Sequence, residues 1–532
     1  MLFNSIAFLF FFPVMVVGFF LFPKRFRWAW LLAGSCYFYA SFVPAYLLIL
    51  FAVIIVNYIC GRIMISKPFE KVSQATARSD DRLILETKHT TSSGIARDGA
   101  SGYFFKKLSS VSKRKWALGI GMASQLGMLF VFKYFNFFQE NISAVANLLH
   151  WNYSMHALRL LLPLGLSFHT FQGLSYLIEV YKGRTAPEKH FGIFALYIMF
   201  FPQLVAGPIE RPQHLLPQFH AEQTFSWPRI LSGIRLMIWG FFKKVVVADR
   251  IAILVNPVYA SLSTAPGPTI AITAILFAFQ LYGDFSGYSS IAKGCARVFG
   301  FELVENFERP YFAKSVAEFW NRWHISLSSW LRDYVYTPLI FSVRRRSRLW
   351  IYTCIVITFL VSGVWHGAGW TYIAMGLFFG LAIALGAYTK PWRDRFVSFI
   401  RLQKLPWLRR SIQITITFTL ACIGWIFFRA PSIKDVGILF GRLFTQWGEV
   451  FAHANDAAYI KKFVLMGTTP SVYLTTIGAV IVLLGVDWIQ EHHPSLLNPP
   501  SRIARVFLAT FLLLIVITFG EFYSKTFIYF QF

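Results

Sequence analysis

Long apolar runs, separated by short polar segments, extend over the whole chain. Each run is roughly 20 residues long, the length that an α-helix needs to cross the ~30 Å hydrocarbon layer of a membrane. A membrane barrel would instead show strands in which apolar and polar residues alternate. Only helices and closed barrels satisfy their backbone hydrogen bonds inside lipid. The pattern therefore predicts an all-α, polytopic integral membrane protein.

The continuous runs predict membrane-spanning helices. They are residues 2–22, 28–42, 45–65, 116–135, 230–247, 268–282, 350–365, 370–388, 411–428, 471–486 and 504–520. The first run lacks a preceding basic segment and a small-residue cleavage site, so we interpret it as a retained span. Two further runs, 158–180 and 191–207, are interrupted by proline and glycine. Broken helices at membrane depth are tolerated only inside protein or along a cavity, so we expect these two in the interior of the bundle.

A polar segment, residues 66–115, divides the apolar pattern. It contains eleven Lys and Arg against five acidic residues. Basic residues in loops mark the cytoplasmic side of a membrane, so we interpret this segment as a cytoplasmic loop. It separates N-terminal helices at 1–65 from a core at 116–532. A basic loop at 24–27 lies two crossings earlier, so both loops are cytoplasmic when the N-terminus lies outside.

The composition agrees with a membrane protein. Hydrophobic residues make up 56% of the chain and charged residues only 14%, whereas soluble proteins carry about 25% charged residues. The net charge of +27 comes from 51 basic and 24 acidic residues. The basic residues cluster in short loops between spans, which argues against a nucleic-acid partner. The five cysteines are scattered singly, without the spacing of a disulfide framework or a metal site.

One polar helix is predicted within the C-terminal half. The spacing of Trp, His and Leu over residues 318–331 predicts a continuous amphipathic helix, with His324 on the same face as the Trp side chains. Glu318 and Arg322 form an i, i+4 pair on another side. The helix is too charged to span the membrane, so it should lie at an interface or enter the protein part-way.

A second histidine, His366, ends an apolar run that follows a basic loop at 344–348. Another basic loop lies at 390–410, so both ends of this helical hairpin are predicted on the cytoplasmic side. His366 stands 18 residues beyond the first basic loop, which is ~27 Å along a helix. It should therefore lie deep, near the tip of the hairpin.

A histidine at membrane depth is a candidate general base, because an unperturbed pKa of ~6.5 lets it accept a proton near neutral pH. Gly363, Gly367 and Gly369 would let a ligand approach the backbone closely. A buried histidine reached by a donor from one side and an acceptor from the other suggests group transfer across the membrane. A structural role, with His366 and His324 bonded to one another or to the backbone, explains the pattern equally well.

Two other polar residues stand in apolar surroundings. His169 lies in the interrupted run 158–180, where a hydrogen bond to a neighbouring helix is the simpler interpretation. Asp284 stands between Gly283 and Gly287 at the end of an apolar run. It could be the N-cap of a following helix or a polar contact in a site, and the sequence leaves both interpretations open.

Four segments resemble motifs of the membrane-bound O-acyltransferase family and stand in the same order as in that family. They are FFPQLVAGPIERP, QLYGDFSGYSSIAKG, RPYFAKSVAEFWNRWHISLSSWLRDYVYTPL and VSGVWHGAGW. With the C-terminal FIYFQF, the resemblance covers nearly the whole chain. It is strongest to the bacterial branch that contains the membrane subunit of alginate O-acetylation and its relatives for cellulose, peptidoglycan and teichoic acids.

The resemblance implies a fold of about eleven transmembrane helices with additional re-entrant and interfacial helices. It implies that His366, in the WHGA motif, is catalytic and that His324, in WHISLSSW, is its partner. We expect Asp284, Asn321 and Arg332 in the polar surroundings as weaker candidates for binding substrate. The polar segment at 66–115 is longer than expected of such relatives, which raises the question of a regulatory role there.

The implied function is transfer of an acetyl group from cytoplasmic acetyl-CoA across the bacterial inner membrane to an alginate-like polysaccharide outside. Acetyl-CoA would be a donor substrate, and no bound cofactor or metal is expected. Expected partners are a periplasmic SGNH-hydrolase-like acetyltransferase, a polysaccharide biosynthesis complex and membrane lipids. Two alternatives remain: a transporter or flippase of an acylated intermediate, in which the histidines gate, and a scaffold of a secretion complex, in which both histidines are replaceable.

Overall fold

The computed structural model describes residues 1–65, 100–151, 157–158, 163–497, 499, 501–522 and 527–528. Within these residues the regular structure is helical, and strand-like pairing is limited to one isolated bridge between Phe307 and Trp323. The predicted all-α class is therefore confirmed. Of the predicted 66–115 loop, residues 66–99 lie outside the described residues. Residues 100–115 belong to a long helix that begins at Ala100.

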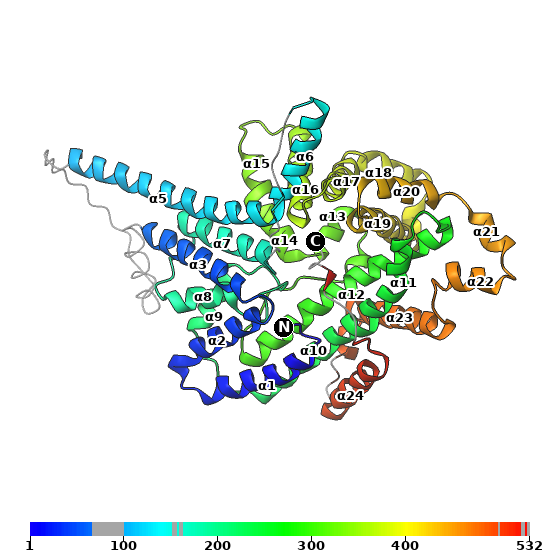
Figure 1. Cartoon of the computed structure of the whole chain (residues 1–532), viewed down its shortest axis with the longest axis horizontal. Helices are drawn as coiled ribbons and strands as arrows, with labels where there is room; N and C mark the ends of the chain where they lie inside the picture. Colours follow the sequence, from blue (N-terminus) through cyan, green and yellow to red (C-terminus); the bar gives the residue numbers. More distant parts are fainter. Residues whose placement is uncertain are drawn as a thin grey trace.

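The described helices among the first 220 residues build one side of the bundle, coloured blue to teal in Figure 1. Their helices are α1 (Ile6–Leu21), α2 (Arg27–Ala40), α3 (Ala45–Ile63), α5 (Ala100–Leu129), α6 (Phe135–Leu148), α7 (Leu166–Tyr181), α8 (Phe191–Met199) and α9 (Pro212–His220). Helix α5 packs along α3 and α7, and α2 packs against α8. The two interrupted apolar runs form α7 and α8, which are almost entirely buried. Their predicted interior position is confirmed.

The long helix α12 (Gly267–Phe299) lies near the centre of the molecule (Figure 1). It is flanked by α10 (Trp227–Phe241) and α11 (Asp249–Ala260), which are joined by a π-helical turn, η3 (Phe242–Ala248). Every residue of η3 is buried, including two lysines. A π-helical turn inserts an extra residue into a helix and is frequent at functional sites.

Short helices and a long hairpin follow α12. They are α13 (Val316–Arg322), α14 (Ile325–Leu331), the π-helical η5 (Arg332–Tyr336), α15 (Thr337–Phe341), α16 (Arg348–His366) and α17 (Trp370–Tyr388). The hairpin is formed by α16 and α17, which pack along each other. Helix α13 contacts α17, and η5 and α15 contact α16, so the short helices pack beside the hairpin.

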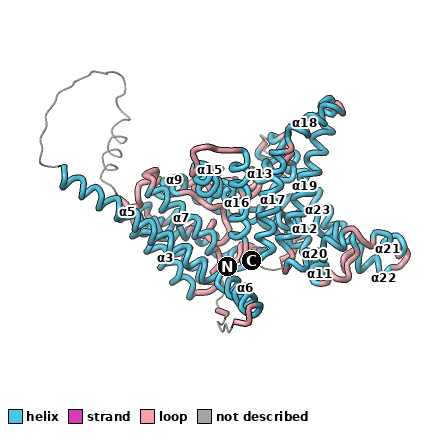
Figure 2. The backbone as a smooth tube through the Cα atoms, turned by 90° about the horizontal axis from the view of Figure 1, so that it is seen from above, coloured by secondary structure: helices cyan, strands magenta, loops and turns pink. Residues whose placement is uncertain are grey.

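The remaining helices complete the other side of the bundle. They are α18 (Lys390–Phe399), α19 (Pro406–Arg429), α20 (Ile433–Leu443), α21 (Trp447–Ala452), α22 (Ala457–Tyr459), α23 (Pro470–His492) and α24 (Arg502–Phe519). Single turns lie between longer elements at η1 (Lys24–Phe26), η2 (Phe130–Tyr134), η4 (Pro310–Phe312), η6 (Leu402–Lys404), η7 (Ile460–Val464) and η8 (Pro494–Leu497). Figure 2 shows α21 and α22 projecting from the edge of the bundle.

In the described part of the chain, eight helices are long and apolar enough to cross a membrane. They are α3, the continuous helix Ser112–Leu148, α12, α16, α17, α19, α23 and α24. Each of them corresponds to a predicted span, so the chain is a multi-pass membrane protein. The spans predicted at 2–22 and 28–42 form α1 and α2, which have 16 and 14 residues and are shorter than the roughly 20 residues of a straight crossing. The span predicted at 230–247 lies within the continuous helical segment formed by α10, η3 and α11 (Trp227–Ala260).

Glycines bring helices into backbone contact at two seams. A Cβ at Gly240 of α10 would lie 2.7 Å from the carbonyl oxygen of Gly287 in α12. In the hairpin, a Cβ at Gly376 of α17 would lie 2.3 Å from the carbonyl oxygen of Phe359 in α16. Lipid solvates apolar side chains as well as protein does, so membrane helices associate through such close packing of small residues.

We expect Gly376→Ala to lower the melting temperature of the purified protein. The added methyl group meets backbone, which cannot move without separating the helices, and overpacking of this kind costs about 1–3 kcal/mol. Gly386→Ala, on the same helix, is the matched control, because nothing lies within 4 Å of its Cβ position and alanine favours the helix. Thermal unfolding in detergent checks both variants. Equal melting temperatures would contradict a tight seam.

Candidate active site

His324 stands at a break between two short helices. Helix α13 ends at Arg322, Trp323 is extended, and His324 has φ 45° and ψ 53°, in the left-handed region. The single helix predicted over 318–331 is therefore wrong, although the Glu318–Arg322 ion pair forms at 2.8 Å. A non-glycine residue in this conformation costs about 1–3 kcal/mol, and such strain collects at functional sites where the surroundings fix it.

Asn306 fixes the break from a neighbouring extended segment. Its carbonyl oxygen accepts a hydrogen bond from Ile325 N at 3.0 Å. Its side-chain Oδ1 accepts from the backbone N and the hydroxyl of Ser326 at 3.2 and 2.9 Å. The isolated bridge joins the next residue, Phe307, to Trp323. Because these bonds satisfy the first donors of α14, the turn before that helix has a defined geometry.

A buried loop supports α14 from a second side. Ile209 donates its backbone N–H to the Ser326 hydroxyl at 3.0 Å. The next residue, Glu210, accepts hydrogen bonds from Val304 N and from His214 Nδ1, both at 2.7 Å. The bond to Glu210 raises the pKa of His214 above its ordinary value. This contact therefore stabilises the loop fully below pH ~6.5 and loses its effect as the pH rises through the raised pKa.

His366 is the last residue of α16, and two side chains from η2 hold the end of that helix. Lys133 Nζ donates to the carbonyl oxygens of Trp365 and His366 at 2.8 and 3.0 Å. The Tyr134 hydroxyl donates to the Val364 carbonyl at 2.7 Å. The last carbonyls of a helix lack partners within it, and a cation there also interacts favourably with the helix dipole. The imidazole of His366 is thus carried on a fixed backbone.

The imidazoles of His324 and His366 lie next to each other, with ring centroids 6.4 Å apart. The Trp365 ring packs beside both, at 5.7 and 5.0 Å. Phe285 lies 4.6 Å from His324, and Phe428 lies 5.7 Å from His366. Both histidines are buried. The structure therefore brings the two residues predicted to be catalytic together in one buried cluster of rings.

A cavity of about 410 Å³ lies beside this pair, between α13, α14 and the α16–α17 hairpin. Its lining includes Trp320, Asn321, Ser328, Arg332, Phe359 and Ser362. Ile325 and Ser362 of the lining stand next to His324 and one helical turn before His366, so the cavity lies close to the histidine pair in the fold. Asn321 and Arg332, both predicted as substrate-binding candidates, line it together. Its volume falls within the range of small-molecule sites, ~300–1,000 Å³.

Asp284 occupies a different place. It lies in the middle of α12, so its interpretation as an N-cap is wrong. Its Oδ1 accepts from Lys244 Nζ at 2.6 Å, and its Oδ2 accepts from the backbone N–H of Ile528 at 2.7 Å. Lys244 also pairs with Asp249 at 2.9 Å. The adjacent Phe285 packs against His324, so Asp284 is linked to that histidine through its neighbour in the chain.

The glycines around His366 serve helix packing. A Cβ at Gly363 would lie 2.3 Å from the carbonyl oxygen of Tyr372, and one at Gly367 would lie 2.1 Å from the Tyr372 ring. The expectation that these two glycines admit a ligand is therefore wrong, because protein fills the space. At Gly369 the nearest atom, also of Tyr372, is at an ordinary contact distance of 3.5 Å.

His169 has a structural partner, as its simpler interpretation required. Its Nε2 lies 2.5 Å from the carbonyl oxygen of Leu204, in the turn that follows α8. Within the described residues, no group of three or more His, Cys, Asp and Glu side chains could hold a metal ion.

Sequence reasoning missed two residues of the site, Lys133 and Asn306. A signal existed for Lys133, which interrupts the apolar run 116–135, because a lone lysine at membrane depth is usually paired or functional. Asn306 carries no such signal. Its role depends on contact with a backbone turn 20 residues further along the chain, and no local pattern records that contact.

Comparison with known proteins gives a consistent result. The model of MBOAT, the membrane-bound O-acyltransferase family, matches residues 188–428, which include His324 and His366. The probable alginate O-acetylase AlgI of Azotobacter vinelandii is 32% identical over 461 residues, which cover 86% of this chain and 81% of the relative. The peptidoglycan O-acetyltransferase of Helicobacter pylori is 31% identical over 472 residues, covering 82% and 78%. The teichoic acid D-alanyltransferase of Bacillus subtilis is 28% identical over 289 residues, covering 50% and 68%.

Proposed function

The chain belongs to the membrane-bound O-acyltransferase family and is a multi-pass acyltransferase; from this premise we propose its reaction. It takes an acetyl group from cytoplasmic acetyl-CoA and passes it across the inner membrane toward a hydroxyl of an alginate-like polysaccharide. The observation that carries this proposal is the enclosed pair of His324 and His366 beside a cavity of about 410 Å³. Two of the relatives are named for O-acetylation of a polymer, which favours acetyl as the acyl group.

His366 acts as the general base in this reaction. Its neutral imidazole takes the proton of the attacking hydroxyl while the new C–O bond forms at the thioester carbonyl. The C–S bond then breaks, and coenzyme A leaves as the thiol after taking the proton from the imidazolium. His324, with its ring centroid 6.4 Å from that of His366, positions the thioester and donates to the developing oxyanion.

The cavity offers a suitable surface to the donor. Asn321 and Arg332 present an amide and a guanidinium to its polar groups, and Trp320 and Phe359 present aromatic surface to its apolar part. The hydroxyl acceptor approaches from the opposite side. The basic loops at both ends of the α16–α17 hairpin support this direction, because such loops favour the cytoplasmic side. The family resemblance supports a periplasmic SGNH-hydrolase-like acetyltransferase as the partner that completes the transfer.

The proposed reaction is tested with the purified chain in liposomes. Labelled acetyl-CoA is supplied on one side and alginate oligosaccharides on the other, and released thiol and labelled ester are measured together. Acceptor-dependent release of coenzyme A supports acyl transfer. Movement of the label across the membrane without release of thiol would favour the transporter instead.

We expect His324→Asn to reduce acyl transfer by about 10²-fold, the effect of removing one donor to an oxyanion. Asparagine tolerates the left-handed conformation observed at this position, so the variant should fold. Alanine does not tolerate the left-handed conformation as well, so His324→Ala should also lose stability. Comparison of the two variants separates the effect of backbone strain from the effect on catalysis. Thiol release and melting temperature are measured for both. Wild-type turnover in His324→Asn would contradict a direct role for the imidazole.

A further inference from the structure

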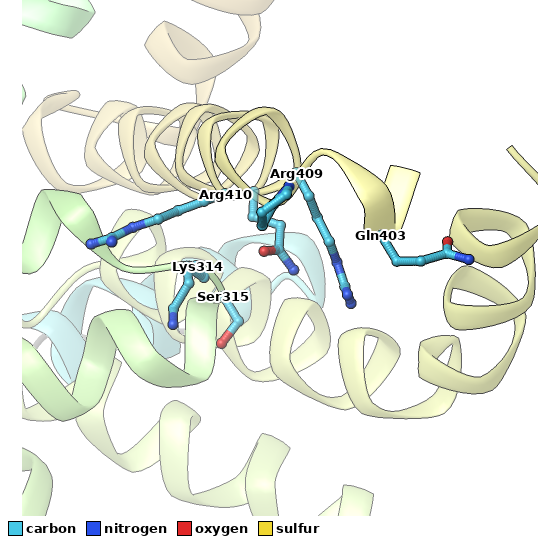
Figure 3. Close-up of a pocket in the computed structure, with 7 residues that line it drawn as sticks. Lys314, Ser315, Gln403, Arg409 and Arg410 are labelled. Carbon is cyan, nitrogen blue, oxygen red and sulfur yellow. The ribbon is translucent and has the colours of Figure 1, made fainter. Parts of the chain in front are cut away.

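A second cavity, of about 430 Å³, opens between the segment that leads into α13 and the first turns of α19. The side chains that line it, drawn in Figure 3, include Lys314, Ser315, Gln403, Arg409, Arg410 and Gln413. Three of them are cations, and none of the lining residues is acidic. The cavity is therefore a positively charged, polar surface that is distinct from the cavity beside the histidines.

Nearby carboxylates neutralise this charge only in part. Arg409 lies 3.7 Å from Asp394, and Arg410 lies 3.8 Å from Glu491. Both distances exceed that of a hydrogen bond. Glu491 is shared with two further arginines, which it approaches to 2.7 and 3.3 Å. Because a guanidinium has five N–H donors, Arg409 and Arg410 keep donors for an anionic ligand.

The position of the cavity places it at the membrane surface. Helix α18 and the turn after it connect α17 to α19, two helices that are long and apolar enough to cross the membrane. This connection exposes Trp392, Phe396 and Phe399, and Trp407 beside the cavity is 67% exposed. Exposed aromatic rings are enriched where a protein meets lipid headgroups. The cavity therefore opens at the level of the headgroups.

We propose that this cavity binds the phosphate group of an anionic phospholipid. The planar forks of Arg409 and Arg410 match phosphate oxygens, and Lys314 adds a compact positive charge. Anionic lipids are attracted to such basic segments at a membrane surface. The acyl chains of the bound lipid lie against the exposed apolar side chains of α17 and α19. This site does not involve the histidine pair, so it is independent of the proposed reaction.

Binding of short-chain phosphatidylglycerol to the purified full-length chain tests this site, with short-chain phosphatidylcholine as the uncharged comparison, by native mass spectrometry. The wild type should prefer phosphatidylglycerol. The triple variant K314Q, R409Q, R410Q should bind it about tenfold more weakly or worse, since even one charge-assisted hydrogen bond is worth about a factor of ten. Added salt should weaken wild-type binding as well.

The matched control is the triple variant R395Q, R401Q, K404Q, which removes the same amount of charge from the neighbouring connection between α17 and α19, at residues that do not line the cavity. It should keep wild-type affinity. Equal losses in the two triple variants, or equal binding of the two lipids by the wild type, would overturn the site. Should the first triple variant unfold, R409Q alone decides by the same comparison.

Competition separates a lipid from a soluble source of phosphate. Phosphatidylglycerol binding that persists in the presence of equimolar inorganic phosphate or coenzyme A supports the lipid. If either soluble compound displaces phosphatidylglycerol from the wild type but not from the triple variant, the assignment to a lipid is overturned in favour of a soluble phosphate.

Discussion

Replacement of His366 by alanine is expected to lower the rate of acyl transfer by about 10²–10⁴-fold, the usual contribution of a general base. The substitution removes the imidazole that receives the hydroxyl proton. The backbone carbonyl of residue 366 keeps its hydrogen bond from Lys133, so the end of α16 remains supported. Release of coenzyme A per mole of folded protein, measured in liposomes, is the direct readout.

His169→Gln is the matched control for this experiment, because His169 is also a buried histidine but is bonded to a backbone carbonyl outside the catalytic pair. Its turnover per folded molecule should stay near the wild-type value even if its melting temperature falls. Full turnover in His366→Ala would contradict the general-base assignment. If polysaccharide acetylation in cells also persisted after this substitution, the scaffold function would be favoured.

The second large effect is expected at the buried ion pairs that Lys244 of η3 makes with α11 and α12. Lys244→Met removes the cation that lies 2.6 Å from Asp284 and 2.9 Å from Asp249. Both carboxylates stay buried and lose their shared counter-charge. Loss of one partner from a buried pair destabilises a protein by about 3–5 kcal/mol. Thermal unfolding of the purified variant in detergent measures the loss.

The neighbouring residue provides the control. Lys243 lies in the same π-helical turn, but its amine donates to the Ser286 carbonyl and the Ser290 hydroxyl, at 3.0 and 2.7 Å. The buried Asp487, which interacts with the charge of Lys243, keeps its hydrogen bond from the Tyr282 hydroxyl at 2.8 Å, so Lys243→Met should cost less stability. The double variant K244M, D284N should recover part of the loss, because it removes one of the two carboxylates as well. Equal destabilisation by the two single lysine substitutions would contradict a special role for the ion pairs.

The length of an apolar run predicted the long helices well. Lipid requires every crossing helix to be both long and apolar, so the helices from α16 onward that cross could be placed within a few residues. Helices α1 and α2 also coincide with predicted runs, but with 16 and 14 residues they are shorter than a straight crossing. Ser5 caps the start of α1 and Pro23 follows soon after its end, and a hydropathy pattern does not record such stop signals.

The sequence predicted which residues form the candidate site better than it predicted their backbone geometry. Apolar surroundings identify His324 and His366, because a histidine at membrane depth is rare without a reason. Periodicity placed His324 on a continuous helix, since the pattern of side chains continues across the break. The left-handed backbone there depends on Asn306, whose hydrogen bonds reach the turn from a distant segment. Such long-range constraints leave no trace in a local pattern.

The bond between Asp284 and the backbone of Ile528 joins residues 244 positions apart. A ribosome adds roughly 5–20 residues per second, so roughly 10–50 s separate the synthesis of α12 from that of its partner. Phe527, next to Ile528, packs against Phe285, which in turn contacts His324. The nascent chain therefore carries its membrane helices for tens of seconds before one wall of the histidine site exists, and the site closes only after residues 527–528 have been made.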